Sequence, residues 1–181
     1  MSSLEKELSE IKSFSAELGL NLSKPEDRFK WFLASILFAK RISAEVAKRT
    51  FKRFEDSGGY VRYDFSTASN LLECMKKLVE EYGDLEEVHR RAKDSKDLEA
   101  RLIQFKGFGP VGVNIFLREL RGTWEKADPE PSPIALMVAE KVGLKDTKPY
   151  ESALVRLHLE YCKKGRCKEC RILEFCKEHK L

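Results

Sequence analysis

The chain has 181 residues, of which 42% are hydrophobic and 35% charged, and its 34 basic and 30 acidic side chains give a net charge of +4. This composition is typical of a folded globular protein and excludes a disordered chain. No apolar run approaches the roughly 20 residues of a membrane-spanning helix, and the first residues lack a signal peptide's apolar stretch. We therefore expect an intracellular protein without membrane association, whose small basic excess permits nucleic-acid binding without requiring it.

Apolar residues recur at helical spacing along almost the whole chain, and no stretch alternates as a half-buried strand would, so the predicted fold class is all-α. Ser23 and Asp94 are expected to cap helices, and Gly122 and Gly143 to end them. Cys74 lies among apolar residues of one predicted helix, and we expect it to pack in the core. The patterns predict helices over residues 2–18, 25–40, 43–54, 66–81, 84–93, 96–106, 110–121, 133–143 and 149–162.

The segment Gly107-Phe108-Gly109-Pro110 predicts a tight reversal between two helices, the first ending at Lys106 and the second beginning at Pro110. The backbone N–H groups at the start of the second helix suit a phosphate oxygen. Phe108 can anchor the turn in the core beneath it. The pattern thus predicts a helix-hairpin-helix that grips the DNA backbone without reading sequence, although a purely structural corner is the alternative. The predicted DNA contacts here are Lys106, Gly107, Phe108, Gly109, Val111 and Gly112.

Four of the five cysteines lie near the C-terminus, in the pattern Cys162-x4-Cys167-x2-Cys170-x5-Cys176. Without a secretory signal, this grouping indicates a metal site rather than disulfides. Four thiolates in a short loop can hold a [4Fe–4S] cluster, and the spacing favours that cluster over the alternative, a structural zinc ion. Basic residues within the loop could contact phosphates or balance the charge of the cluster.

Together these motifs resemble the endonuclease III superfamily of helix-hairpin-helix DNA glycosylases, over roughly residues 25–176. The resemblance implies a two-lobed fold with a helical barrel over residues 25–127 and a cluster lobe over 1–24 plus 128–181. It also implies a monomer that binds double-stranded DNA with a base flipped out of the stack, and a monovalent cation at the hairpin. The resemblance places Lys40 and Arg41 where relatives fill the gap left by that base, so both are candidate DNA contacts; the alternative is a solvated helix end.

The resemblance implies two catalytic positions, and this chain departs from both. Where family members with lyase activity carry a lysine nucleophile the chain has Val111, so no lyase chemistry is expected. Where active members carry an aspartate at a helix start it has Ser132, which can cap the helix but brings no negative charge. Asp128 and Glu130, in the preceding loop, are the candidate replacements.

Three hypotheses therefore stay open. The first is a monofunctional DNA glycosylase that uses Asp128 or Glu130. The second is a non-catalytic DNA-binding relative of the base-excision-repair enzymes. The third is a zinc-bound interaction module with no role on DNA.

Overall fold

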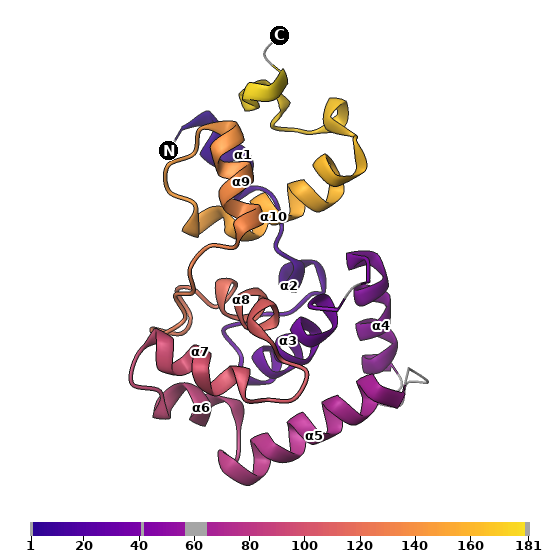
Figure 1. The fold of residues 1–181 in the computed structure, drawn as a ribbon, viewed down its shortest axis with the longest axis vertical. Helices are drawn as coiled ribbons and strands as arrows, with labels where there is room; N and C mark the ends of the chain where they lie inside the picture. The colour runs from indigo at the N-terminus through magenta and orange to yellow at the C-terminus, as the bar shows by residue number, and fades with distance from the viewer. Residues whose placement is uncertain (1, 41, 57–64, 180–181) are drawn as a thin grey trace. The chain divides into compact units, whose positions relative to one another are not determined.

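The computed structural model describes residues 2–40, 42–56 and 65–179, and every regular element in these ranges is a helix or a 3-10 turn (Figure 1). The predicted all-α fold class is therefore confirmed. No helix within these ranges has both the length and the apolar character needed to cross a lipid bilayer.

The chain divides into two compact units. One unit combines the two ends of the chain, residues 1–17 and 130–181, and the other contains the continuous segment 18–129. We call them the terminal unit and the central unit, and each is described by itself.

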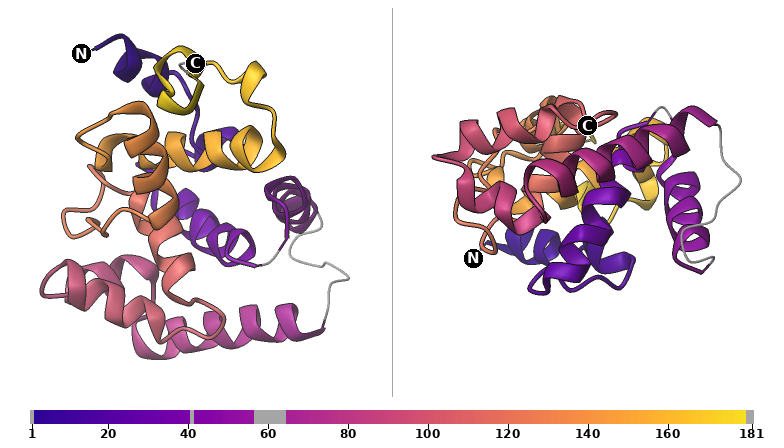
Figure 2. Two further views of the ribbon diagram at one scale, coloured as in Figure 1. Left: turned by 45° about the horizontal axis from the view of Figure 1, so that its top comes forward. Right: turned by 90° about the horizontal axis from the view of Figure 1, so that it is seen from below.

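The central unit is built around α3, an apolar helix that packs against α4, α6 and α8 (Figures 1 and 2). Trp31 and Phe32 on α3 are fully buried, and the ring of Phe32 packs edge-on against Phe105, Phe108 and Phe116. These aromatic side chains form the centre of its core. In the part of this unit that the structure describes, the helices are α3 (Pro25–Phe38), α4 (Ala44–Asp56), α5 (Phe65–Glu81), α6 (Leu85–Arg91), α7 (Ser95–Ile103) and α8 (Pro110–Arg118).

The start of α3 differs from its prediction, because Lys24, and not Ser23, is the N-cap residue, and no side chain caps the helix there. Pro25 occupies the first turn, and a proline forces the residue before it into an extended conformation, which Lys24 adopts. Ser23 therefore stands one residue too early to cap. The cap predicted at Asp94 is present, since its side chain accepts the N–H of Asp97 at 2.8 Å.

A polar network lies beside this aromatic core. Trp124 is 3% exposed, and its ring stacks on His89 with centroids 4.6 Å apart. The indole Nε1 donates to Glu86 Oε2 at 3.2 Å, while Arg28 donates to the other oxygen of Glu86 at 2.7 Å. Cys74 is also buried in this unit, as predicted, and burial raises the pKa of its thiol to about 12.

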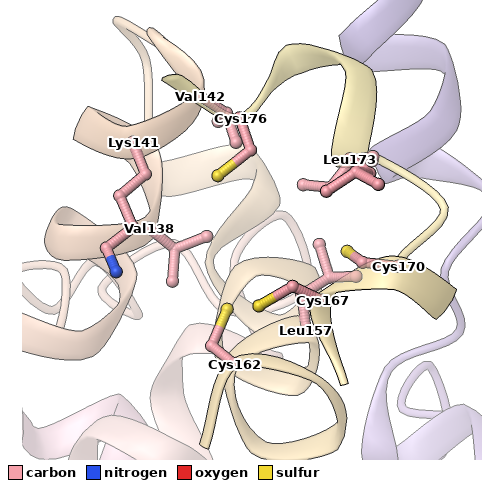
Figure 3. A pocket seen from close by; sticks show the side chains of 10 residues that line it. Val138, Lys141, Val142, Leu157, Cys162, Cys167, Cys170, Leu173 and Cys176 are labelled. Atoms are coloured by element: carbon pink, nitrogen blue, oxygen red, sulfur yellow. The ribbon is translucent and has the colours of Figure 1, made fainter. Parts of the chain in front are cut away.

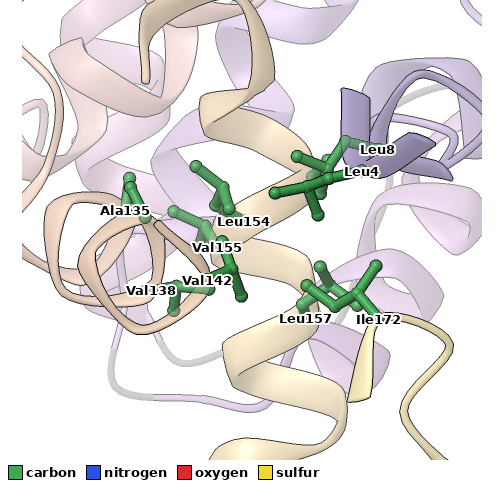
Figure 4. Close-up of a cluster of buried hydrophobic side chains, with 11 residues drawn as sticks. Leu4, Leu8, Ala135, Val138, Val142, Leu154, Val155, Leu157 and Ile172 are labelled. Carbon is green, nitrogen blue, oxygen red and sulfur yellow. The ribbon is translucent and has the colours of Figure 1, made fainter. Parts of the chain in front are cut away.

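The terminal unit packs α9 (Pro133–Val142) against α10 (Glu151–Glu160), with α1 (Ser3–Ser9) against α10. Figure 4 shows Leu4 and Leu8 of α1 pointing toward Leu154 and Leu157 of α10. The apolar faces of these three helices therefore form one core, to which the C-terminal segment adds Ile172. The remaining elements are the short helix α2 (Phe14–Glu17) and 3-10 turns at Lys148–Tyr150, Cys162–Lys164, Cys167–Glu169, Leu173–Phe175 and Lys177–His179.

The prediction of a single helix over residues 2–18 is wrong, because the helical conformation is interrupted between Ser9 and Phe14. Ser13 causes a new start: its hydroxyl accepts the N–H of Ala16 at 3.3 Å, as a helix-capping side chain does. The predicted end at Gly143 is confirmed, since this glycine has a left-handed backbone with φ of 71° directly after α9.

Candidate DNA-binding hairpin and cysteine pocket

The reversal between α7 and α8 has the geometry of a tight hairpin. After α7 the backbone N–H of Phe105 bonds to the carbonyl of Leu102, and that of Phe108 to the carbonyl of Phe105. Gly107 then turns the chain with φ of +81°, which a side chain rarely tolerates. Gly109 is extended and starts α8 as its N-cap residue. The glycines therefore supply the conformations that this short connection requires.

Phe108 anchors the hairpin from within, as predicted. Its side chain is 1% exposed, and its ring lies 4.8 Å from that of Phe32. The next turn of helix fits closely over this ring, because a Cβ atom at Gly112 would lie only 2.8 Å from Phe108 Cδ2. Phe108 and Gly112 thus hold the start of α8 on the core by packing.

The start of α8 is left without a side-chain cap. Gly109 has no side chain to accept the first N–H groups, and Pro110 has no N–H of its own. Val111 follows and is 64% exposed. The positive end of the α8 dipole and its first amide hydrogens are therefore available to an anion at an exposed surface.

Two basic residues predicted to contact DNA lie near this helix start. Lys40 follows Ala39, and a Cβ at Gly112 would lie 3.4 Å from Ala39 Cβ, so the end of α3 abuts the start of α8. Lys106 is at the turn, where its ammonium bonds to Glu73 at 2.6 Å; both side chains are more than half exposed. An exposed pair of this kind is weak, so Lys106 can exchange its partner. Arg41, also predicted to contact DNA, lies outside the described residues.

Asp128 and Glu130, the candidate acid groups, are both exposed and near basic side chains. The Asp128 side chain is 52% exposed, and its Oδ1 lies 3.5 Å from Arg121 Nε within the central unit. The Glu130 side chain is 91% exposed, with Oε1 3.8 Å from Lys148 Nζ within the terminal unit. Neither carboxylate therefore has the desolvated surroundings that tune catalytic acids.

The start of α9 carries a carboxylate that the sequence analysis missed. Ser132 caps α9, as predicted, by accepting the N–H of Ala135 at 3.4 Å. Its own N–H donates to Oε1 of Glu151 at 2.9 Å, and Glu151 is 1% exposed. A carboxyl group therefore does lie at this helix start, supplied by the first residue of α10. This buried hydrogen bond between Ser132 and Glu151 joins the start of α9 to the start of α10.

The four C-terminal cysteines line one pocket in the terminal unit. Figure 3 shows the sulfur atoms of Cys162, Cys167, Cys170 and Cys176 around a common space. Cys162 and Cys167 are the first residues of two short 3-10 turns, and Cys170 and Cys176 each directly follow such a turn. Apart from the thiols and Lys141, the walls are aliphatic: Val138, Val142, Leu157, Ile172 and Leu173.

Two of the pocket thiols, those of Cys162 and Cys170, are disfavoured as thiolates. Burial raises the pKa of the Cys162 thiol, and negative charge on Cys167 or Cys170 would raise it further. Burial also raises the pKa of the Cys170 thiol. Metal binding must therefore displace protons from these sulfurs. Within the described ranges no set of three or more His, Cys, Asp or Glu side chains is arranged to hold one metal ion, so the four thiols share a pocket but do not have the arrangement of a single-ion site.

The basic residues of the cysteine loop fall into two groups. Arg166 pairs with Glu169, and the Arg171 guanidinium lies 2.7 Å from both Glu7 and Glu10 of the N-terminal segment. Arg171 thus joins the two ends of the chain. The second group is exposed and consists of Lys163, Lys164 and Lys168.

We compared the chain with protein-family models, with curated proteins and with solved structures, and none of them matches it.

Proposed function

We propose that this chain is a DNA-binding protein of the base-excision-repair type, which holds double-stranded DNA by its backbone at the hairpin between α7 and α8. The observation that carries the proposal is the uncapped start of α8, exposed at Val111 and fixed from beneath by Phe108. Amide hydrogens and a helix dipole at a rigid, exposed corner suit a phosphate group. Lys40 and Lys106 add positive charge nearby.

This mode of binding recognises the backbone and carries no sequence information. It should therefore weaken as salt increases, because bound phosphates release their counterions. The resemblance adds a monovalent cation, held by carbonyl oxygens of the hairpin beside the phosphate, and a base flipped out of the duplex.

A pair of exposed valines allows a test with a matched control. Val111 is 64% exposed at the hairpin, and Val79 is 63% exposed on α5. Val111→Glu places a negative charge where the phosphate would lie, so we expect duplex affinity to fall at least about tenfold, or 1.4 kcal/mol. Val79→Glu changes the net charge equally and should leave binding nearly unchanged. Fluorescence anisotropy with a labelled duplex at several salt concentrations measures both, and equal losses in the two variants would refute the hairpin as the site.

We further propose that the cysteine pocket holds a [4Fe–4S] cluster. Four thiols around one largely aliphatic pocket match the ligand set of such a cluster. The cluster's iron would supply the positive charge that buried thiolates need.

Iron and sulfide analysis of protein purified without air tests this cofactor. Cys176→Ser removes one ligand and should lower the iron and sulfide content, whereas Cys74→Ala removes a buried thiol of the central unit and should not. Zinc in place of iron and sulfide would reject the cluster, as would equal iron in Cys176→Ser and in the unaltered protein.

A monofunctional DNA glycosylase is the second candidate, favoured by the carboxylate of Glu151 at the start of α9. Lyase chemistry is not expected, because Val111 has no amine to form a Schiff base. We place DNA binding first because Asp128 and Glu130 are exposed and Glu151 is buried.

Incubation with end-labelled duplexes, each containing one damaged or mismatched base, separates the two functions. Strand cleavage seen only after hot alkali would establish a glycosylase, and Asp128→Asn, Glu130→Gln and Glu151→Gln would then locate the acid group. Binding to these duplexes without any cleavage would support the non-catalytic function.

A further inference from the structure

We infer that Lys141, held by Glu178, balances the charge of the group in the cysteine pocket and raises its reduction potential. The inference rests on the proposed [4Fe–4S] cluster. Its starting point is the composition of the pocket, since Lys141 is the one residue with a formal charge among the ten described residues that line it. Figure 3 shows the lysine side chain extending from α9 on the same side of the pocket as Val138.

The position of Lys141 is held by an ion pair. Its ammonium lies 2.9 Å from Oε2 of Glu178, and the exposed fractions of the two side chains are 25% and 60%. The ion pair therefore holds the charged lysine beside the pocket that the four cysteines line.

A cation in this place has a defined effect on an iron–sulfur cluster. Four thiolates give the cluster a net negative charge, and reduction adds one more negative charge, which a nearby cation stabilises. The interaction is stronger at a partly buried site than at the surface, where water and salt screen the exposed Lys163, Lys164 and Lys168. The negative charge of Glu178 lowers the reduction potential and so opposes the effect of Lys141. Its effect is smaller, because Glu178 is the more exposed of the two side chains.

Redox titration of the reconstituted protein, followed by the cluster's visible absorbance, tests the inference. Lys141→Met should lower the reduction potential by the equivalent of about a tenfold change in the one-electron equilibrium, about 59 mV. Glu178→Gln should raise it by less. Lys145→Met is the matched control, because it removes the same charge from an exposed position four residues along the chain and should leave the potential unchanged.

Each outcome has a distinct meaning. Protein that contains no iron or sulfide rejects the proposed cluster and, with it, this inference. A cluster whose potential is the same in Lys141→Met and Glu178→Gln as in the unaltered protein overturns the inference alone. If Lys141→Met loses its cluster, Lys141→Arg decides: a retained cluster supports a role of the charge, and its loss shows that the shape of the lysine matters instead.

Discussion

Gly112 offers a direct test of how the hairpin is attached to the central unit. A Cβ atom at this position would lie 2.8 Å from Cδ2 and 3.0 Å from Cε2 of Phe108, and 3.4 Å from Ala39 Cβ. Carbon atoms in good contact are about 3.5–4.0 Å apart, so the ring would have to move by about 0.7 Å. Phe108 is 1% exposed and already packs against Phe32, and that environment resists the movement.

The expected cost of Gly112→Ala follows from two opposing contributions. Overpacking a filled core costs about 1–3 kcal/mol. Alanine gains up to about 1 kcal/mol over glycine within a helix. Subtracting the full gain leaves about 0–2 kcal/mol, so we expect the free energy of unfolding to fall by about 1 kcal/mol, and the melting temperature to fall by roughly 2–4 °C for each kcal/mol in a chain of this size.

Chemical denaturation monitored by circular dichroism measures this change, and Gly109→Ala is the control. A Cβ at Gly109 would meet nothing within 4 Å, and the backbone there has φ of −80°, which alanine accepts. Loss of the N-cap glycine destabilises the helix start, whereas the lower conformational entropy of alanine in the unfolded chain stabilises the fold. The two effects oppose each other, and each is about 1 kcal/mol or less. A Gly112→Ala protein at least as stable as Gly109→Ala would refute the argument that Phe108 is locked beneath α8.

Two further predictions concern protonation and helix capping. Burial, and then the charge of Lys126, lower the pKa of His89, so the unfolded chain binds its proton more readily. The free energy of unfolding should therefore be highest above about pH 6.5 and fall as the pH decreases below that value. His89→Gln should make this pH dependence less steep in unfolding titrations, and an unchanged pH dependence would contradict the prediction. The pKa of His158 is also lowered, so part of the pH dependence should remain in the variant. Ser132→Ala removes the cap of α9 and should cost about 1 kcal/mol by thermal unfolding, whereas an unchanged melting temperature would show that Glu151 alone holds this helix start.

Much of the fold could be predicted from local patterns. Apolar periodicity, glycine positions and capping residues act within a few positions of one another, so the all-helical fold, the end of α9 at Gly143 and the caps at Asp94 and Ser132 could be read from the sequence. Where two local signals compete, the sequence alone does not decide between them. Ser13 interrupts an otherwise continuous apolar pattern, and Pro25 moves the cap of α3 to Lys24.

The side chains that the sequence analysis missed all depend on contacts between distant segments. Glu151 reaches the start of α9 only because α10 packs beside it, and Lys141 meets Glu178 across 37 positions of the chain. No spacing rule connects such residues. Cys162, Cys167, Cys170 and Cys176, by contrast, lie close in sequence, and the prediction that they act together needed only their spacing.

The construction of the terminal unit has a consequence for how the chain is made. Its core needs Leu4 and Leu8 from one end and Ile172 from the other, and Arg171 pairs with Glu7 and Glu10. A ribosome adds about 5–20 residues per second and releases the N-terminal end first. The central unit can therefore complete its core during synthesis, whereas the apolar face of α1 must wait for the last segment of the chain. Cells that produce C-terminally shortened chains should then accumulate protein with a folded central unit and an exposed apolar N-terminal helix, the kind of surface that chaperones and proteases recognise.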